Sequence, residues 1–261
     1  MADLETFKST TERDGWCTIV VPCFNEAARL QIGSFHEFLA LGYPVRFLFV
    51  NDGSSDDTLK VLEAMRCGFE DFVAVLNKPV NAGKSEAVRD GILQAIREGN
   101  ADFVGFWDAD LATPLASIVD LRQELVDHPR VQMVFGARVR LLGREIHRKP
   151  LRHYLGRVFA TVVSIVIQLP VYDTQCGAKL FRVTPEISEI FAEPFSSRWV
   201  FDVEILARYI RRHGRQMQLV SSSICEYPLE EWYDVAGSKV RPKDFCRAFV
   251  DVVRIHRKYL A

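Results

Sequence analysis

The sequence lacks the features that mark secreted, membrane-spanning and nucleic-acid-binding proteins. Its 261 residues carry a formal net charge of −1, which argues against a polyanion binder, so we expect no nucleic-acid partner. The six cysteines include no C-x-x-C pair, which favours free thiols in a reducing compartment over disulfides or a zinc site. The longest apolar stretch, 158–169, is shorter than the about 20 residues that span a bilayer. Residues 1–15 form a polar extension without an apolar signal segment, and we therefore expect a cytoplasmic protein, soluble or peripheral on a membrane.

Two nucleotide-binding patterns are also absent. The P-loop pattern G-x-x-x-x-G-K-[ST] does not occur, and G-x-G-x-x-G does not follow the first strand-like run, which counts against a dinucleotide-dependent oxidoreductase. No Gly/Ser-rich linker and no internal repeat divides the chain. We therefore predict a single domain over residues 16–261, with a first half, 16–137, and a second half, 138–261, of different character.

The first half alternates between strand and helix patterns. Strands are predicted at 17–22, 45–50, 72–76, 103–107 and 131–135. Helices are predicted at 25–41, capped by Asn25, and at 57–65, 84–97 and 114–126. This alternation is typical of an α/β fold with a mostly parallel sheet and helices on both faces.

The second half contains basic and amphipathic segments. Residues 138–157 hold seven Lys/Arg and a single acid, Glu145. The pattern predicts helices at 151–169, from Trp199 to about His213, and at 242–259, with a strand-like stretch at 217–227. The helix at 151–169 is mostly apolar, and the stretch 239–258 is basic and amphipathic. Such helices either pack on a core or lie in a membrane interface, so we expect a C-terminal helical elaboration with peripheral membrane contact.

Polar motifs follow four of the predicted strands. They lie at 22–26, 52–54, 81–84 and 108–110. Ligands of parallel α/β sheets bind beyond the carboxyl ends of the strands, so these four motifs are expected to meet at one site.

Two of these motifs suit a nucleotide. Asp52 can accept hydrogen bonds from a base or ribose while Gly53 and Ser54 let the backbone come close, although Asn-Asp-Gly-Ser is also a strong turn former. Lys84 begins a predicted helix, where its ammonium and the free backbone N–H groups favour a phosphate over a purely solvated side chain.

Asp108 and Asp110 form a D-x-D pair at the end of a buried strand. In extended backbone both carboxylates project to the same side, and they repel each other unless a cation lies between them. Mg²⁺ or Mn²⁺ would bind both and leave positions for phosphate oxygens. Two surface aspartates in a turn are the simpler alternative, but the strand-end position favours a metal site, with Asp110 a catalytic residue.

Taken together, these motifs resemble those of glycosyltransferase family 2, which has the GT-A fold. The segment D-T-Q-C-G-A-K-L-F at 173–181 is similar to the D-T-Q-C-G-F-K-L-F signature of dolichyl-phosphate β-glucosyltransferases, with Ala178 in place of the usual Phe. Phe201-Asp202-Val203-Glu204 also matches that subgroup.

The resemblance implies an inverting transfer of a hexose from a nucleoside diphosphate sugar to a polyprenyl or dolichyl phosphate, with UDP-glucose favoured and GDP-mannose an alternative. It places Asp108 and Asp110 at the metal. It places one group of residues near the nucleoside: Pro22, Phe24, Asn25, Glu26 and Asp52. Alternatives are a soluble transferase that acts on a saccharide or small-molecule hydroxyl, a nucleotidyltransferase, and a non-catalytic nucleotide-sugar binder.

A lipid phosphate needs cationic partners, and the second half supplies them. Arg138, Arg148 and Arg152 offer guanidinium groups for phosphate oxygens. Asp173 is the candidate for orienting the acceptor or accepting its proton, and Gln175 and Lys179 are candidate contacts to sugar or phosphate. The sequence also allows a homo-oligomer.

Overall fold

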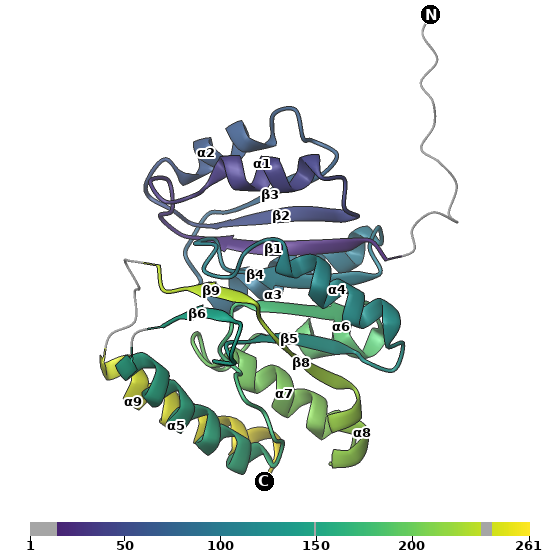
Figure 1. The fold of residues 1–261 in the computed structure, drawn as a ribbon, viewed down its shortest axis with the longest axis vertical. Helices are drawn as coiled ribbons and strands as arrows, with labels where there is room; N and C mark the ends of the chain where they lie inside the picture. Colours follow the sequence, from purple (N-terminus) through teal and green to yellow (C-terminus); the bar gives the residue numbers. More distant parts are fainter. Residues whose placement is uncertain (1–14, 149, 236–241) are drawn as a thin grey trace, which may run out of the picture.

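The structure is a computed structural model that describes residues 15–148, 150–235 and 242–261 (Figure 1), with side chains described for 15–148, 153–235 and 247–261. A seven-stranded sheet has the order β3-β2-β1-β4-β7-β5-β8, and β6 pairs with β9 in a small second sheet. The strands are β1 Cys17–Cys23, β2 Val45–Asp52, β3 Val73–Lys78, β4 Phe103–Trp107, β5 Met133–Ala137, β6 Glu145–His147, β7 Ala178–Arg182, β8 Ile224–Pro228 and β9 Glu231–Tyr233. The helices are α1 Ile32–Ala40, α2 Thr58–Arg66, α3 Lys84–Glu98, α4 Ser117–Asp127, α5 Pro150–Ile167, α6 Pro185–Ala192, α7 Phe201–Arg212, α8 Met217–Ser222 and α9 Pro242–Tyr259.

The large sheet is mostly parallel, as predicted. Strands β3, β2, β1 and β4 run parallel, and so do β5 and β8. Strand β7 runs antiparallel between β4 and β5, with Ala178 opposite Trp107. The start of β7 therefore lies at the same edge of the sheet as the ends of β4 and β5, where the predicted motifs gather. Strands β7 and β8 come from the predicted second half, so both halves build one sheet, and the predicted boundary at 137/138 stays a prediction.

Helices cover both faces of this sheet. One face packs against α1, α2 and α4 through side chains such as Phe35, Leu62 and Leu121. The other face packs against α3, α5, α6, α7 and α9 through side chains such as Ile92 and Phe159. Because the central strands are buried on both faces, they have nearly continuous apolar sequences, such as C-T-I-V-V-P-C in β1.

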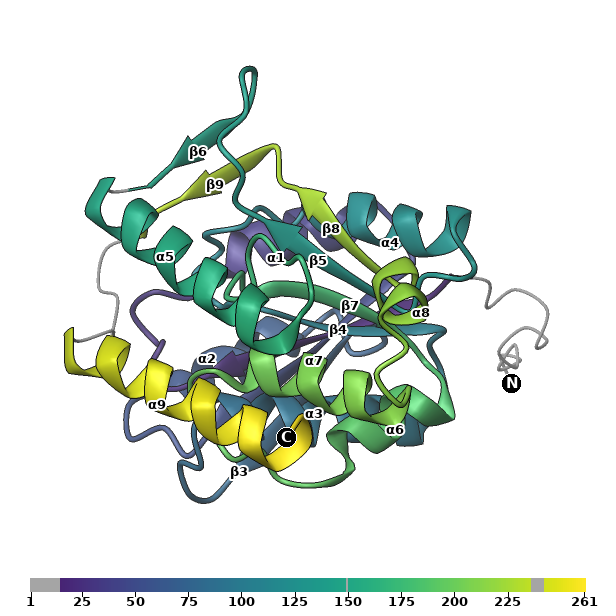
Figure 2. The same ribbon diagram turned by 90° about the horizontal axis from the view of Figure 1, so that it is seen from below.

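Helices α5 and α9 lie side by side at one end of the molecule (Figures 1 and 2). Both bury a stripe of side chains in the core, including Val163 of α5 and Val252 of α9. Among the described residues no helix is long and apolar enough to cross a membrane.

Two predicted elements are wrong. The helix predicted from Asn25 begins instead at Ile32, because Asn25 adopts a left-handed conformation with φ of 53° and its side chain accepts a hydrogen bond from the backbone N–H of Ser55. The stretch 217–227 is not one strand: its first part forms α8, which buries only Val220, and β8 follows. Helix α6 and the strands β6, β7 and β9 were not predicted.

Candidate active site at the strand ends

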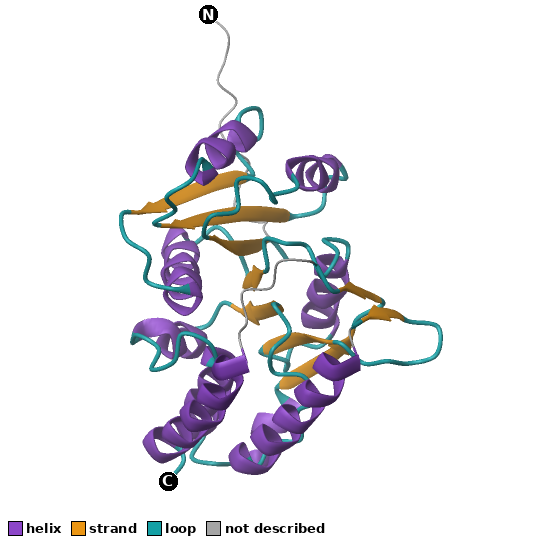
Figure 3. Cartoon of the chain, turned by 90° about the vertical axis from the view of Figure 1, so that its left-hand side faces the viewer, coloured by secondary structure: helices purple, strands orange, loops and turns teal. Residues whose placement is uncertain are grey.

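The predicted motifs meet at one edge of the large sheet. Strand β1 runs from right to left in Figure 1, so the carboxyl ends of the parallel strands lie at the left of that view and face the viewer in Figure 3. The loops after β1, β2, β3 and β4 and the turn before β7 all lie there.

The loop after β1 is fastened to the loop after β2. The backbone N–H of Asn25 donates to Oγ of Ser54 at 3.0 Å, and that of Glu26 donates to Oγ1 of Thr58 at 2.8 Å. Phe24 is exposed beside them, and Pro22 is half-buried in β1. These hydrogen bonds fix the backbone of the loop that is predicted to lie near the nucleoside. Contacts of its residues with a ligand stay a prediction.

The carboxylate of Asp52 is buried and already accepts hydrogen bonds from the backbone. With 2% of its surface exposed, it accepts backbone N–H groups from Ala82 at 3.0 Å and Gly83 at 2.7 Å. Gly53 has φ of 63°, and a Cβ there would lie 2.4 Å from the backbone nitrogen of Asn81. Gly53 therefore permits a close approach of the turn after β3, and its predicted close approach to a ligand stays a prediction. A contact of Asp52 with a base or ribose would have to use its remaining lone pairs.

Lys84 joins the turn after β3 to the D-x-D pair. Its ammonium lies 2.5 Å from Oδ1 of Asp108, and both side chains are 37% exposed. Burial lowers the pKa of Lys84, but the carboxylates of Asp108 and Asp202 outweigh this and raise it above its ordinary value. Lys84 therefore remains a cation at the rim of the site.

Asp110 carries a carboxylate that the protein stabilises only in part. It accepts the backbone N–H of Ala112 at 3.1 Å, and Arg29 lies 3.9 Å away. Burial and the neighbouring Asp108 raise the pKa of Asp110 above the usual carboxyl range. A divalent cation between the two carboxylates would relieve this repulsion.

The donor set fits such a cation. No cluster of three or more His, Cys, Asp or Glu ligands occurs in the described part of the chain. The metal prediction therefore rests on Asp108 and Asp110 alone, which suits a hard ion that takes its other ligands from phosphate and water. Gly177 is needed beside this pair, because a Cβ at that position would lie 1.9 Å from Oδ2 of Asp108.

Asp173 and Arg138 form a buried ion pair at the end of β5. Nε and Nη2 of Arg138 donate to the two carboxylate oxygens at 2.6 and 2.7 Å, and the backbone N–H of Arg138 donates at 3.1 Å. Burial alone would raise the pKa of Asp173, but the guanidinium of Arg138 holds this pKa far below the usual range. A carboxylate so acidic is a poor base near neutral pH, and its two bonds orient Arg138. The role of Asp173 toward an acceptor stays a prediction.

Arg148 adds a second cation near this pair. Its guanidinium lies against Gly156 of α5, where a Cβ would be 2.6 Å from Nη2. Burial and the charge of Arg138 lower the pKa of Arg148 to about 10. An anion near Arg148 would offset this repulsion. The side chain of Arg152 lies outside the described residues.

Lys179 does not face a ligand. It is fully buried, its ammonium lies 2.7 Å from Oδ1 of Asp202, and it donates to the carbonyl of Cys176 at 2.5 Å. The predicted sugar or phosphate contact is thus corrected to a structural ion pair beneath the site. Gln175 is half-buried; its backbone N–H donates to Asp173, and its side-chain nitrogen has no hydrogen-bond partner among the described residues.

Two site residues were missed. Glu226 of β8 accepts the backbone N–H groups of Tyr172 and Asp173 at 2.7 Å each, and this fixes the segment before β7. An acid within an apolar strand is a usable signal. Arg198, between α6 and α7, packs against Gly83; an exposed loop arginine carries no comparable signal.

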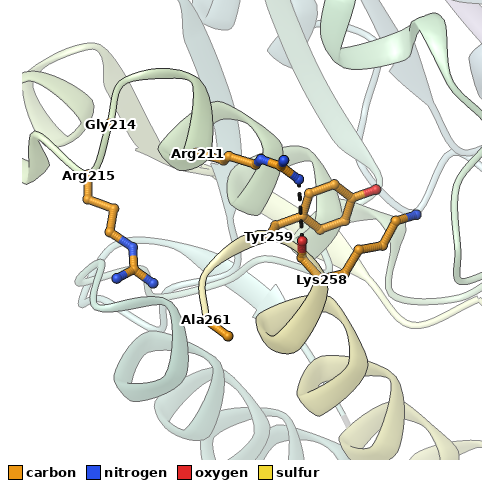
Figure 4. A pocket seen from close by; sticks show the side chains of 6 residues that line it. All are labelled: Arg211, Gly214, Arg215, Lys258, Tyr259 and Ala261. Carbon is orange, nitrogen blue, oxygen red and sulfur yellow. Dashed lines mark hydrogen bonds between the residues drawn. The ribbon is translucent and has the colours of Figure 1, made fainter.

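A separate hollow of about 350 Å³ lies where α7 and α9 end (Figure 4). Its lining residues are Arg211, Gly214, Arg215, Lys258, Tyr259 and Ala261. Arg211 donates to the backbone carbonyl of Lys258 across it. No predicted site residue lines this hollow, so we do not assign it to the site.

Comparison with known proteins identifies the family of the chain. The family model Glycosyl transferase family 2 matches residues 18–187. A dolichyl-phosphate beta-glucosyltransferase of Trichomonas vaginalis is 30% identical over 253 residues, which cover 92% of this chain and 70% of that protein. A dolichyl-phosphate beta-glucosyltransferase of Saccharomyces cerevisiae is 30% identical over 93% of this chain and 75% of its own length.

Solved structures give the same fold. Glucosyl-3-phosphoglycerate synthase from Mycobacterium tuberculosis has a TM-score of 0.64 at 18% identity, covering 92% of this chain and 79% of that chain. The mannosyltransferase PcManGT from Pyrobaculum calidifontis has a TM-score of 0.59 at 15% identity, covering 93% and 63%. The predicted GT-A fold is confirmed, and on the family model and the relatives together the chain belongs to glycosyl transferase family 2.

Proposed function

We propose that this glycosyltransferase inverts configuration and moves glucose from UDP-glucose to a polyprenyl phosphate such as dolichyl phosphate. The names of the relatives from Trichomonas vaginalis and Saccharomyces cerevisiae support the sugar and the acceptor. The observation that carries the proposal is the position of Asp108. The carboxylate of Asp108 contacts Lys84 from the first half of the chain and lies against Gly177 from the second half. The proposed donor and acceptor sides of the site therefore adjoin at Asp108.

The donor diphosphate is proposed to lie against Lys84 and the D-x-D pair. Asp108 and Asp110 would hold Mg²⁺ or Mn²⁺, which would neutralise charge on the leaving diphosphate. The PcManGT structure, a complex with GDP-Man and Mn²⁺, supports a divalent metal for this fold. Lys84 adds a fixed positive charge that does not depend on the metal.

The acceptor phosphate is proposed to bind Arg138 and Arg148. Asp173 fixes the guanidinium plane of Arg138, so its position is set before the acceptor arrives. A phosphate oxygen then attacks the anomeric carbon from the side opposite the diphosphate. The new carbon–oxygen bond forms as the bond to the diphosphate breaks, and UDP leaves with the electron pair. Because a phosphate is already anionic, no general base is required. Arg152 and Gln175 are further candidates for this side.

A peripheral contact with the cytoplasmic face of a membrane would bring the protein to its acceptor. Helix α5 exposes Tyr154, Leu155, Val158 and Ile165 in one stripe. The neighbouring α9 exposes Val250 and Val253 together with the basic residues Arg254, Arg257 and Lys258. Apolar and basic side chains on adjoining helices suit an anionic lipid surface.

A donor and acceptor panel tests the proposal. The purified protein is supplied with Mg²⁺ or Mn²⁺ and with UDP-glucose, GDP-mannose or UDP-N-acetylglucosamine, each with and without a polyprenyl phosphate in detergent. We expect release of UDP from UDP-glucose only when the lipid phosphate is present. Turnover that ignores the lipid would point to a saccharide or small-molecule hydroxyl as acceptor, and release of pyrophosphate to a nucleotidyltransferase. Binding without turnover would leave a nucleotide-sugar binder.

A further inference from the structure

The segment 193–200, between α6 and α7, crosses from the second half of the chain to the donor side of the site. Within it, Arg198 packs on the turn after β3: a Cβ added at Gly83 would lie 3.3 Å from Cδ of Arg198 and 3.7 Å from its Nε. Gly83 in turn donates to Asp52 and precedes Lys84. Arg198 therefore lies beside the residues that are proposed to meet the donor diphosphate.

This segment is fastened to the donor half. The backbone N–H of Phe195 donates to Oε1 of Glu86 at 3.0 Å, and just before the segment Nη2 of Arg89 donates to the carbonyl of Ala192, the last residue of α6, at 2.5 Å. Glu86 and Arg89 both belong to α3, the helix that Lys84 begins.

The same segment is fastened to α7 and α9. The backbone N–H of Ser196 donates to Glu204 of α7 at 2.8 Å. Oγ of Ser197 donates to Oδ2 of Asp251 of α9 at 2.8 Å and accepts the backbone N–H groups of Trp199 and Val200 at 3.2 and 3.1 Å. The backbone on both sides of Arg198 is thus held by hydrogen bonds, and this restricts the region that its guanidinium can reach.

The charge of Arg198 is not matched by an acid. Its side chain is exposed, and no ion pair with it occurs among the described residues. The neighbouring cation, Lys84, already uses Asp108. Lys84 and Arg198 thus place two cations on the two sides of Gly83, and two cations suit a ligand that carries more than one negative charge.

We propose that Arg198 is a further binding residue of this site and that its guanidinium contacts the diphosphate of the nucleotide sugar. The inference rests on the proposed function for the identity of the donor. A planar guanidinium can donate two parallel hydrogen bonds to phosphate oxygens, which a lysine cannot. As the bond from the anomeric carbon to the diphosphate breaks, negative charge grows on the oxygens that Arg198 faces, so it assists departure of UDP as well as binding.

The test compares Arg198→Gln and Arg198→Lys with the control Arg130→Gln. Arg130 is exposed in the turn between α4 and β5, at the opposite edge of the sheet. Binding of UDP, inorganic pyrophosphate and uridine is measured by titration calorimetry, and thermal melts check that every variant is folded. For Arg198→Gln we expect about tenfold weaker binding of UDP and of pyrophosphate, which corresponds to one lost hydrogen bond to a charged group, and unchanged binding of uridine.

The other variants sharpen the result. Arg198→Lys should lie between wild type and Arg198→Gln, and Arg130→Gln should match wild type. Wild-type affinity for UDP and pyrophosphate in Arg198→Gln would overturn the inference, as would a wild-type protein that binds neither probe. If only the KM for the lipid phosphate changes, Arg198 serves the acceptor and the inference is wrong. Loss of pyrophosphate binding in a protein that turns over no UDP-glucose would instead refute the proposed donor and leave the phosphate contact in place.

Discussion

Two lysine–aspartate pairs lie near Phe106 of β4, and they differ in access to solvent. The ammonium groups of Lys84 and Lys179 lie 6.0 and 5.3 Å from the centre of that ring. The pair of Lys84 with Asp108 is half-open, with 37% of each side chain exposed, whereas Lys179 is 0% and Asp202 8% exposed.

This difference in exposure indicates that the first pair can bind a ligand, whereas the second pair stabilises the fold. An open pair can exchange its partner for a ligand, because water and phosphate reach both charges. A closed pair cannot, since each charge would be left without a partner in a medium of low dielectric constant. We therefore expect changes on the open side to alter activity and changes on the closed side to alter stability.

The largest expected effect is on the open side, at Asp110. Replacing Asp110 with Ala removes one of the two proposed metal ligands, and we expect a loss of about 10³-fold in kcat/KM, which corresponds to several kcal/mol of transition-state stabilisation. The measurement is UDP release, with the melting temperature as a check on folding. Asp71→Ala, at an exposed aspartate in the turn before β3, is the matched control. More than a tenth of wild-type activity in Asp110→Ala would exclude the metal assignment.

On the closed side, Lys179→Met should destabilise the fold. It leaves the carboxylate of Asp202 buried without its partner, and breaking a buried pair in this way costs about 3–5 kcal/mol. A denaturant titration would show a lower midpoint with an unchanged slope. A variant as stable as wild type would mean that Asp202 finds another partner or a proton, and the contrast between the pairs would fail.

Lys84→Met is the counterpart on the open side. We expect its free energy of unfolding to change by less than about 1 kcal/mol, because the pair is half-exposed. The KM for the nucleotide sugar should rise about tenfold, since a charged hydrogen-bond donor to phosphate is lost. A large loss of stability with unchanged KM would reverse the roles of the two lysines.

The smallest expected effect is a pH-dependent gain in stability for Asp110→Asn without divalent metal. Burial and Asp108 raise the pKa of Asp110 in the folded protein, so the folded state holds its proton more tightly than the unfolded chain. The stability that Asp110 contributes is therefore full below the ordinary carboxyl range and is lost as pH rises through the raised pKa. Asparagine does not ionise, so the variant should melt slightly higher than wild type at about pH 8 and equally at about pH 4. A constant difference at all pH values would contradict this.

The donor side could be predicted from the sequence because its strands carry their own signals. Strands β1, β2 and β4 are continuous apolar runs, each followed by a polar turn, and parallel strands place those turns together. The position of Asp108 and Lys84 at one edge follows from this pattern alone.

The acceptor side depended on contacts between distant segments, which local patterns do not reveal. A lysine within A-K-L-F-R reads as half-exposed, and only Asp202 on α7 explains why Lys179 is buried. The same holds for one donor-side residue: Asn25 is a good helix cap by type, but its side chain accepts the backbone N–H of Ser55 from the next loop. Asp173 reads as a base until Arg138 is seen to bind both of its oxygens.

The reversed strand β7 has a consequence for the order in which the fold can form. In the described sheet β5 pairs with β7 and β8, both of which are made after it, and β4 waits for β7 on one side. A chain growing on the ribosome therefore holds β3, β2, β1 and β4 as a sheet in which the β4 edge is unpaired, while β5 has no strand to join. Until residues 178–182 emerge and enter between β4 and β5, that edge is exposed to other chains. The insertion of β7 also brings Gly177 against Asp108, so the site is completed in the same step that covers the β4 edge.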